Sequence, residues 1–448
     1  MALFVIIISL FVKLNSNSSE ILIQDPNFEK ALIEAGFDSD RMINGKISSD
    51  DILRIDSLYI SNKGIKSLSN IDKFTNLKKI ICDDNIIEEI DFSRNDSLTY
   101  IRIASNKLIK LNVLDLKKLK YLFCSSNNLK EINLSRNINL IQFDGRFNEF
   151  KKIDFSKNSK LTYVNLMFRN KIDSLDFSQN KYLEQLFLRS VNLKNIDISN
   201  CIDLKVLNID RNNIQSIDLI NCRKLEYLEV GENNLSEINL INNNHLKYFD
   251  AHSNRISKFD LTQNTVIEEL DLRSNPIVVL KYRRNNELKK LNLNNCGISS
   301  VRLKKFPNLE RIDIEGNKLN RLNLSKNKNL KEIAIYKNNI RRIKVCDKVK
   351  SLGIAYNPIK KINVSDKKEL IRFHADFTKL KTLNFENCNY VSYLGCDNIS
   401  TLKLITLPQK AILDFSLRKD TTAFFFNIPP THIYSYDNLD KRHIFKKK

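Results

Sequence analysis

The sequence lacks the short motifs that mark the common catalytic sites. It contains no G-x-S-x-G nucleophile elbow, no H-E-x-x-H metal-binding pair and no glycine-rich phosphate loop. Histidine occurs 5 times, glycine 9 times and tryptophan not at all. His374 and Asp376 share one strand face, but no nucleophile accompanies them, so a surface salt bridge is the favoured interpretation. We therefore expect no enzyme activity, no catalytic residues, no metal site and no cofactor.

Long hydrophobic runs are also missing. The apolar run at residues 2–12 is too short to span a bilayer but suits the core of a secretory signal peptide, and no later segment reaches transmembrane length. A buried first strand is the alternative interpretation of this run. We expect a signal peptide at residues 1–19, a secreted or cell-surface location, and no transmembrane span in the mature chain.

The sequence consists mostly of one short motif that is repeated along most of its length. The copy that begins at Leu225 has apolar residues at positions 1, 4, 6, 11, 14 and 16 and asparagine at position 9, and the next copy begins 21 residues later at Leu246. A fixed period of this size and spacing is the leucine-rich repeat, in which stacked coils share one core. Positions 4 and 6 of a short strand point inward, positions 3, 5 and 7 point outward, and the asparagine bonds backbone groups at a turn.

About 17 copies follow this pattern. They begin at Ile55, Leu77, Leu98, Leu119, Leu140, Leu161, Leu183, Leu204, Leu225, Leu246, Ile267, Leu288, Leu309, Leu330, Val349, Leu370 and Val391. Positions 14 and 16 alternate as in a strand, so we expect extended segments on the convex side. The prediction is a curved, β-rich leucine-rich-repeat solenoid with a parallel concave sheet. Its parts are a small helical N-terminal cap (20–54), the repeats (55–406), and a C-terminal cap with a basic tail (407–448).

The segment before the repeats carries helix signals and a family resemblance. Asp25 followed by Pro26 predicts a helix N-cap and a first-turn proline. Residues 23–33 (IQDPNFEKALI) and 43–48 (INGKIS) resemble the N-terminal cap of secreted leucine-rich-repeat proteins of Bacteroidetes-type bacteria. The unit I-D-F-S-x-N, seen at 90–95, is similar to internalin-J-like repeats. The resemblance implies an exported, surface-attached or secreted protein that binds rather than catalyses.

One loop and the cysteines are possible metal or disulfide sites, and each also has an ordinary structural explanation. Asp40, Asn44 and Asp51 partly match a calcium-binding loop, but Met42 stands at a ligand position, so a plain turn is favoured. No C-x-x-C pair occurs among the 8 cysteines, which argues against a zinc site. Cys201 and Cys222 lie one repeat apart, so a disulfide is geometrically possible. Buried thiols that pack as small hydrophobic groups are the favoured interpretation for all of them.

The net charge of +21 raises the question of a nucleic-acid partner. The basic pairs, such as Lys151-Lys152, lie in the convex turns and form no stripe with aromatic residues on the strand face. We therefore expect no nucleic-acid binding.

The outward positions of the strands carry the candidate ligand site. Tyrosine recurs at position 3 in the first half, which suits either a stacking platform for a protein or sugar or mere packing between coils. From Leu204 to Leu330 seven acids oppose three bases on this face, a local charge of −4 in a basic protein. This inversion suits a basic protein ligand or a divalent cation; a habit of the repeat is the alternative. The candidate residues are Tyr121, Phe123, Tyr163, Phe187, Asp210, Tyr227, Glu229, Tyr248, Asp250, His252, Asp271, Arg273 and Asp313.

These observations together predict an exported or cell-surface protein that binds a protein or glycan ligand on its concave face. The alternatives are a structural spacer of the cell surface, in which length matters and the face does not, and a glycan binder that accompanies a surface enzyme. The oligomeric state does not follow from the sequence.

Overall fold

The computed structural model describes residues 19–396, 398–407, 414–416 and 424–425. The expected signal peptide and most of the expected C-terminal segment lie outside these residues. The chain divides into two compact units, one ending at Lys171 and the other beginning at Ile172.

The N-terminal part of the first unit is a cap of two short helices and a two-stranded antiparallel sheet: β1 (Glu20–Leu22), α1 (Pro26–Glu34), β2 (Lys46–Ser48) and α2 (Ser49–Leu53). Asp25 caps α1 as predicted, since its Oδ1 accepts hydrogen bonds from the backbone N–H groups of Asn27 and Phe28 at 2.8 and 3.3 Å. Its Oδ2 accepts from the N–H groups of Lys66 and Ser67 at 2.6 and 2.9 Å. One carboxylate therefore both starts the helix and joins the cap to the first coil.

The loop that resembles a calcium site is held together by its own hydrogen bonds. Asp40 accepts from the N–H of Met42 and from the side chain of Asn44, both at 2.8 Å. Asp51 accepts from the hydroxyl of Ser39 at 2.7 Å. The two carboxylates thus bond different parts of the loop, which agrees with the turn interpretation.

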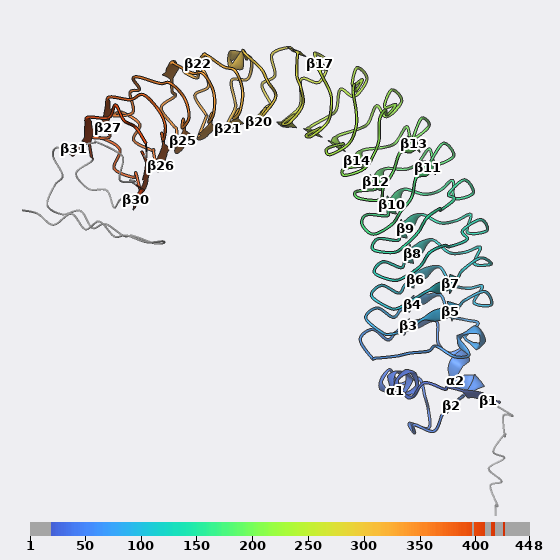
Figure 1. Cartoon of the computed structure of the whole chain (residues 1–448). Helices are drawn as coiled ribbons and strands as arrows, with labels where there is room; N and C mark the ends of the chain where they lie inside the picture. The colour runs from blue at the N-terminus through green and yellow to red at the C-terminus, as the bar shows by residue number, and fades with distance from the viewer. Residues whose placement is uncertain (1–18, 397, 408–413, 417–423, 426–448) are drawn as a thin grey trace, which may run out of the picture. The chain divides into compact units, whose positions relative to one another are not determined.

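Strands at positions 3 to 5 of each coil form one parallel sheet per unit, in register from coil to coil (Figure 1). In the first unit these are β3 (Ser57–Tyr59), β4 (Lys79–Ile81), β6 (Tyr100–Arg102), β8 (Tyr121–Phe123), β9 (Gln142–Asp144) and β10 (Tyr163–Asn165). In the second unit they are β12 (Gln185–Phe187), β14 (Val206–Asn208), β15 (Tyr227–Glu229), β16 (Tyr248–Asp250), β18 (Glu269–Asp271), β20 (Lys290–Asn292), β21 (Arg311–Asp313), β23 (Glu332–Ala334), β25 (Ser351–Gly353), β26 (Arg372–His374), β28 (Tyr393–Gly395) and β30 (Asp414–Ser416). This confirms the predicted parallel sheet, and we call the face that it presents the strand face.

The opposite, convex side of the coils is extended, as predicted. Strands pair there as β5 (Glu89–Asp91) with β7 (Lys110–Asn112), β11 (Ser174–Asp176) with β13 (Asn195–Asp197), β17 (Lys258–Leu261) with β19 (Val279–Tyr282), β22 (Arg321–Asn323) with β24 (Arg342–Lys344), and β27 (Thr382–Asn384) with β29 (Leu404–Thr406) and β31 (Phe424–Phe425). Two coils carry a 3-10 turn instead, η1 (Ile71–Lys73) and η2 (Leu303–Lys305). Among the described residues no helix has the length and apolar character needed to cross a bilayer.

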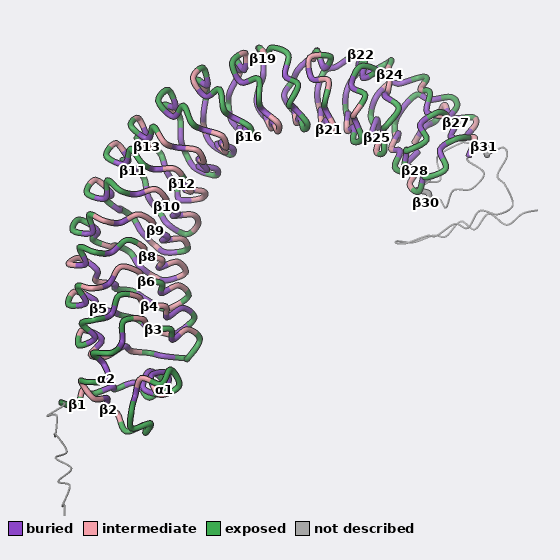
Figure 2. Tube along the Cα trace, turned by 180° about the vertical axis from the view of Figure 1, so that it is seen from behind, coloured by how far each residue is buried: buried purple, intermediate pink, exposed green. Residues whose placement is uncertain are grey.

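The core fills the inside of the coils (Figure 2), and asparagine at position 9 closes the turn in most of them. Asn127, 1% exposed, is typical. Its Nδ2 donates to the carbonyls of Ile103, Cys124 and Ser125 at 3.0, 3.1 and 3.2 Å, and its Oδ1 accepts from the N–H of Leu108 at 2.9 Å. The predicted role of position 9 is therefore confirmed, because one side chain satisfies backbone groups of two adjacent coils.

A second ladder, at position 19, was not predicted. Asn264 donates from Nδ2 to the carbonyls of Leu240 and Asn243 at 3.1 and 2.9 Å. Cysteine replaces asparagine in some coils and keeps the donor role, as when Sγ of Cys388 lies 3.0 Å from the carbonyl of Val364. The thiol therefore occupies the place of the amide as a smaller donor.

All 8 cysteines are free and buried, which confirms the thiol interpretation. Cys201 and Cys222, the candidate disulfide, are two rungs of the position-19 ladder and are not bonded to each other. Burial raises the pKa of each thiol to about 12, so both stay protonated at neutral pH.

Candidate functional site

The acidic residues predicted on the strand face of the second unit lie in line on adjacent strands. The register pairs Asn208 with Glu229, Glu229 with Asp250, and Asp250 with Asp271. Asn292 and Asp313 continue the row on β20 and β21. We use the name acidic patch for Asp210, Tyr227, Glu229, Tyr248, Asp250, His252, Asp271, Arg273 and Asp313.

Two tyrosines form the flat part of the acidic patch. The rings of Tyr227 and Tyr248 are stacked, with centroids 4.3 Å apart and planes inclined by 8°. The hydroxyl of Tyr227 donates to Glu229, which also accepts from the amide of Asn208. Burial and the carboxylates nearby raise the pKa of Tyr248 to about 12. Both rings are thus neutral at physiological pH and are held beside a fixed carboxylate.

Asp210 is the most buried acid of the patch, at 3% exposure. Its Oδ1 accepts the backbone N–H of Gly231 at 2.7 Å. Burial, with repulsion from Glu229 and Asp250, raises its pKa to about 6. Ionising this buried carboxyl therefore costs more in the folded protein than in the unfolded chain, so the charge that it carries at neutral pH lowers the stability of the fold.

His252 lies against the same group of acids. Its Nδ1 is 2.6 Å from Oδ1 of Asp250, and its Nε2 is 3.4 Å from Glu232. The hydrogen bond to Asp250 is the main reason that the pKa of His252 is raised. A Cβ atom on Gly231 would lie 2.3 Å from the imidazole ring, so the glycine leaves the space that the ring occupies.

Beside this group the strand face has a polar hollow of about 250 Å³, lined by residues of β16, β18, β20 and β21. Arg273 pairs with Asp271 and Arg311 pairs with Asp313, each at 2.7 Å. The side-chain amide of Asn292 also donates to Asp271 at 3.0 Å. The patch is therefore partly neutralised from within. Among the described residues no group of three or more His, Cys, Asp or Glu side chains is placed to hold a metal ion.

An ion-pair ladder borders the strand face of the second unit at position 2. Lysine and glutamate alternate from coil to coil, and each lysine pairs with the glutamate 21 residues earlier. The pairs are Lys205–Glu184, Lys247–Glu226, Lys289–Glu268 and Lys331–Glu310, at 2.9, 2.7, 2.7 and 2.8 Å. This exposed border is therefore electrically balanced.

The aromatic candidates of the first half do not form one continuous row. Tyr121 and Phe123 pack with Tyr100, with ring centroids 5.7 Å (Tyr100–Tyr121) and 5.6 Å (Tyr100–Phe123) apart. Strand β9 separates Tyr121 from Tyr163 and carries Gln142 at the corresponding position. Phe187 belongs to β12 of the second unit. Within the first unit, Gln142 therefore interrupts the predicted row of rings between Tyr121 and Tyr163.

A second aromatic group, on the C-terminal strands, was not predicted. The rings of Tyr336, His374 and Tyr393 meet edge to face, with centroids 5.8 and 5.4 Å apart. Tyr336 lies over Gly353 and His374 over Gly395, where a Cβ atom would come within 2.1 and 2.2 Å of the rings. In the sequence, this group is indicated by glycine at position 5 of one coil together with an aromatic residue in the previous coil. His374 also pairs with Asp376 at 2.9 Å, as the sequence indicated.

Exposed aromatic residues also occupy a strained position at the edge of the strand face. Position 8 is left-handed in nearly every coil, with φ near +55°, and usually carries a small or polar residue. Tyr356 and Phe377 stand there instead, 48% and 47% exposed, with stacked rings 4.5 Å apart. Phe147 and Phe168 repeat the arrangement in the first unit at 5.0 Å.

Comparisons with known proteins agree with this geometry. The structure is similar to that of the functional domain of InlJ from Listeria monocytogenes, described as including a cysteine ladder, at 23% identity over 89% of this chain and 77% of that chain (TM-score 0.62). It is also similar to YopM from Yersinia enterocolitica, at 17% identity over 86% and 93% (TM-score 0.65). The internalin InlF of Listeria monocytogenes matches at 19% identity over 70% and 95% (TM-score 0.51).

No protein-family model matches the chain, and no curated protein matches it. The structural matches, all below 25% identity, speak to the fold alone. Together with the register and the asparagine ladders, they establish that the chain is a leucine-rich-repeat solenoid of the kind seen in internalins and YopM.

Proposed function

We propose that this protein is exported and that the acidic patch binds a basic segment of a protein ligand. The observation that carries the proposal is the charge inversion. A chain with a net charge of +21 places Glu229, Asp250 and Asp271 side by side on adjacent strands and buries Asp210 among them. Such a row is unfavourable for folding, so a ligand is a reason for a sequence to keep it.

The shape of the patch supports a protein ligand with lysine or arginine side chains. The hollow of about 250 Å³ has room for one long side chain, and its wall includes Asp271 and Asp313, each of which is paired there with an arginine. The stacked rings of Tyr227 and Tyr248 add a rigid surface of the kind found at protein interfaces. A glycan is the second candidate, favoured by the same ring stack, and a spacer role remains the alternative without a ligand.

Binding of the chain to arrays of cell-surface proteins and glycans tests the proposal. The variant Asp271→Lys reverses the charge of one side chain in the hollow, and Asp260→Lys makes the same change on the exposed convex strand β17. We expect a protein ligand whose binding falls about tenfold or more with Asp271→Lys and is unchanged by Asp260→Lys. Equal loss in both variants would show long-range charge alone, and a ligand that tolerates both would place the site elsewhere.

A further inference from the structure

The convex side of the second unit is interrupted between the coils that begin at Ile267 and Leu288. Strand β19 pairs with β17 on one side only. On its other side the following coil has the 3-10 turn η2 in place of a strand. A groove of about 740 Å³ lies there, between β19 and residues 297–302.

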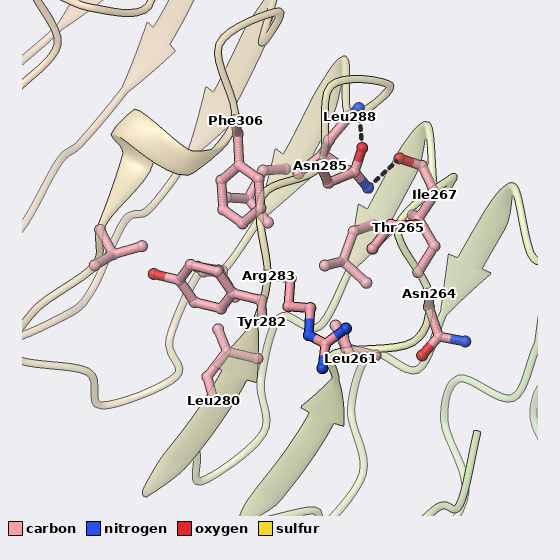
Figure 3. Close-up of a pocket in the computed structure, with 14 residues that line it drawn as sticks. Leu261, Asn264, Thr265, Ile267, Leu280, Tyr282, Arg283, Asn285, Leu288 and Phe306 are labelled. Carbon is pink, nitrogen blue, oxygen red and sulfur yellow. Dashed lines mark hydrogen bonds between the residues drawn. The ribbon is translucent and has the colours of Figure 1, made fainter. Parts of the chain in front are cut away.

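Tyr282 is the physical cause of this groove. Its ring lies between the coils and packs on Phe306, with centroids 4.8 Å apart, and Figure 3 shows the two rings next to each other. The hydroxyl of Tyr282 accepts the backbone N–H of Arg302 at 2.8 Å, a donor that a neighbouring strand would otherwise use. The two coils are hydrogen-bonded to each other at both ends of the groove. There the backbone N–H of Ile277 donates to the carbonyl of Cys296, and that of Asn285 donates to the carbonyl of Lys305.

The strand edge in the groove is open to a partner. In a parallel pair, alternate residues direct both backbone groups to the same neighbour. Val279 donates to Ser257, in the turn that leads into β17, so Leu280 directs its N–H and carbonyl toward the groove. Val278 is 80% exposed there, the highest exposure among the large apolar side chains of the described residues. An open edge with exposed valine is the template that an added strand requires.

The charge around the groove has one sign. Lys281, Arg302 and Lys305 line it, and no acidic side chain does. Lys281 pairs with Asp260 at 3.6 Å, whereas the amine of Lys305 bonds only the carbonyl of Tyr282 and no ion pair is found for Arg302 within the part of the chain that the structure describes. Arg283, Arg284 and Lys304 stand next to these residues in the sequence.

We propose that this groove binds an acidic peptide in extended form, which adds to the open edge of β19 as a further strand. The edge has the length of β19, so it holds a segment of about four residues. Main-chain hydrogen bonds would hold the peptide in place, and Arg302 and Lys305 would select acidic side chains over basic ones. The ligand chemistry is opposite to that of the acidic patch, so the two sites do not compete.

Fluorescence anisotropy with a labelled heptapeptide of alternating glutamate and valine, added to the full chain, tests this proposal. We expect saturable binding that weakens about tenfold in Arg302→Glu and in Val278→Asp, two exposed substitutions that leave the core intact. Lys360→Glu, an exposed convex substitution with the same charge change, is the matched control and is expected to bind as the unaltered chain does.

Two peptide controls separate strand addition from simple charge attraction. When alternate backbone nitrogens of the same peptide carry methyl groups, those nitrogens can no longer donate hydrogen bonds, while the charge of the peptide is unchanged. We expect this peptide to bind at least about tenfold more weakly. A peptide of alternating lysine and valine is expected not to bind. The proposal is overturned if the N-methylated peptide binds equally well, if Lys360→Glu weakens binding as much as Arg302→Glu, or if the acidic peptide does not bind at all.

Discussion

Replacing Asp210 by asparagine should stabilise the folded protein at neutral pH. Asparagine keeps the shape of the side chain. Its Oδ1 atom can still accept the hydrogen bond that the backbone N–H of Gly231 donates to Asp210 at 2.7 Å. It removes a carboxylate whose pKa is raised from 3.8 to about 6 by burial and by repulsion from Glu229 and Asp250. The difference corresponds to an upper limit of about 3 kcal/mol for ionising the group in the folded state.

The pH dependence has a definite sign. The folded state holds this proton more tightly than the unfolded state, so the contribution of Asp210 to stability is greatest below pH 4 and falls as the pH rises to about 6. The gain in Asp210→Asn should therefore be absent below pH 4 and reach a plateau of about 2 kcal/mol above pH 6. Urea unfolding followed by circular dichroism at several pH values measures this difference.

Asp260→Asn serves as a control of opposite sign. Hydrogen bonds from Thr262 lower the pKa of this exposed aspartate, so its carboxylate stabilises the fold above pH 4 and the variant should lose that small contribution. A gain in Asp210→Asn that does not vary with pH, or a loss at pH 8, would refute the account of the buried acid.

Three further substitutions test other parts of the structure. Gly231→Ala should displace the His252 ring, lower the melting temperature and return the imidazole pKa toward 6.5 in an NMR titration, because the new Cβ atom overlaps the ring. Asn264→Cys should cost less stability than Asn264→Ala, by about 1 kcal/mol in urea unfolding, because a thiol at this rung keeps a donor. Phe147→Asn should leave the unfolding midpoint nearly unchanged, since relief of the left-handed strain, about 1 kcal/mol, offsets the lost ring stacking.

The repeat made the register of the strands predictable from the sequence. Side chains alternate along a strand, so the inward positions and the outward row of Glu229, Asp250 and Asp271 follow from the period alone. The ladder of asparagines at position 9 is predictable in the same way, because each asparagine occupies the same turn of its coil. These features are local, and each coil supplies the same information again.

The ladder at position 19 and the ion pairs at position 2 were equally periodic but were missed. Both become visible when one position is read down the copies: Glu184, Lys205, Glu226 and Lys247 alternate in sign at every step. A single copy of the repeat does not contain this alternation, because it extends over successive copies.

Burial of the polar residues could not be predicted from the period. Asp210 and His252 occupy outward positions, yet both are less than 10% exposed because side chains of neighbouring coils cover them. The space for His252 depends on the absence of a side chain at Gly231, one coil earlier. Such properties belong to combinations of residues in adjacent coils.

A residue that reduces stability without improving the packing is a candidate for a functional role in this solenoid. A solenoid gains stability by repeating one favourable coil, so a residue that breaks the rule without improving the packing needs another reason to be there. Asp210 carries a charge that burial disfavours, Phe377 holds a bulky ring in a left-handed backbone, and Tyr282 opens the convex side of two adjacent coils. The three residues lie on the strand face, at its edge and on the convex side. If ligand binding is the reason for these residues, Asp210→Asn should stabilise the fold and weaken binding of the ligand to the acidic patch, whereas a purely structural spacer would gain stability at no functional cost.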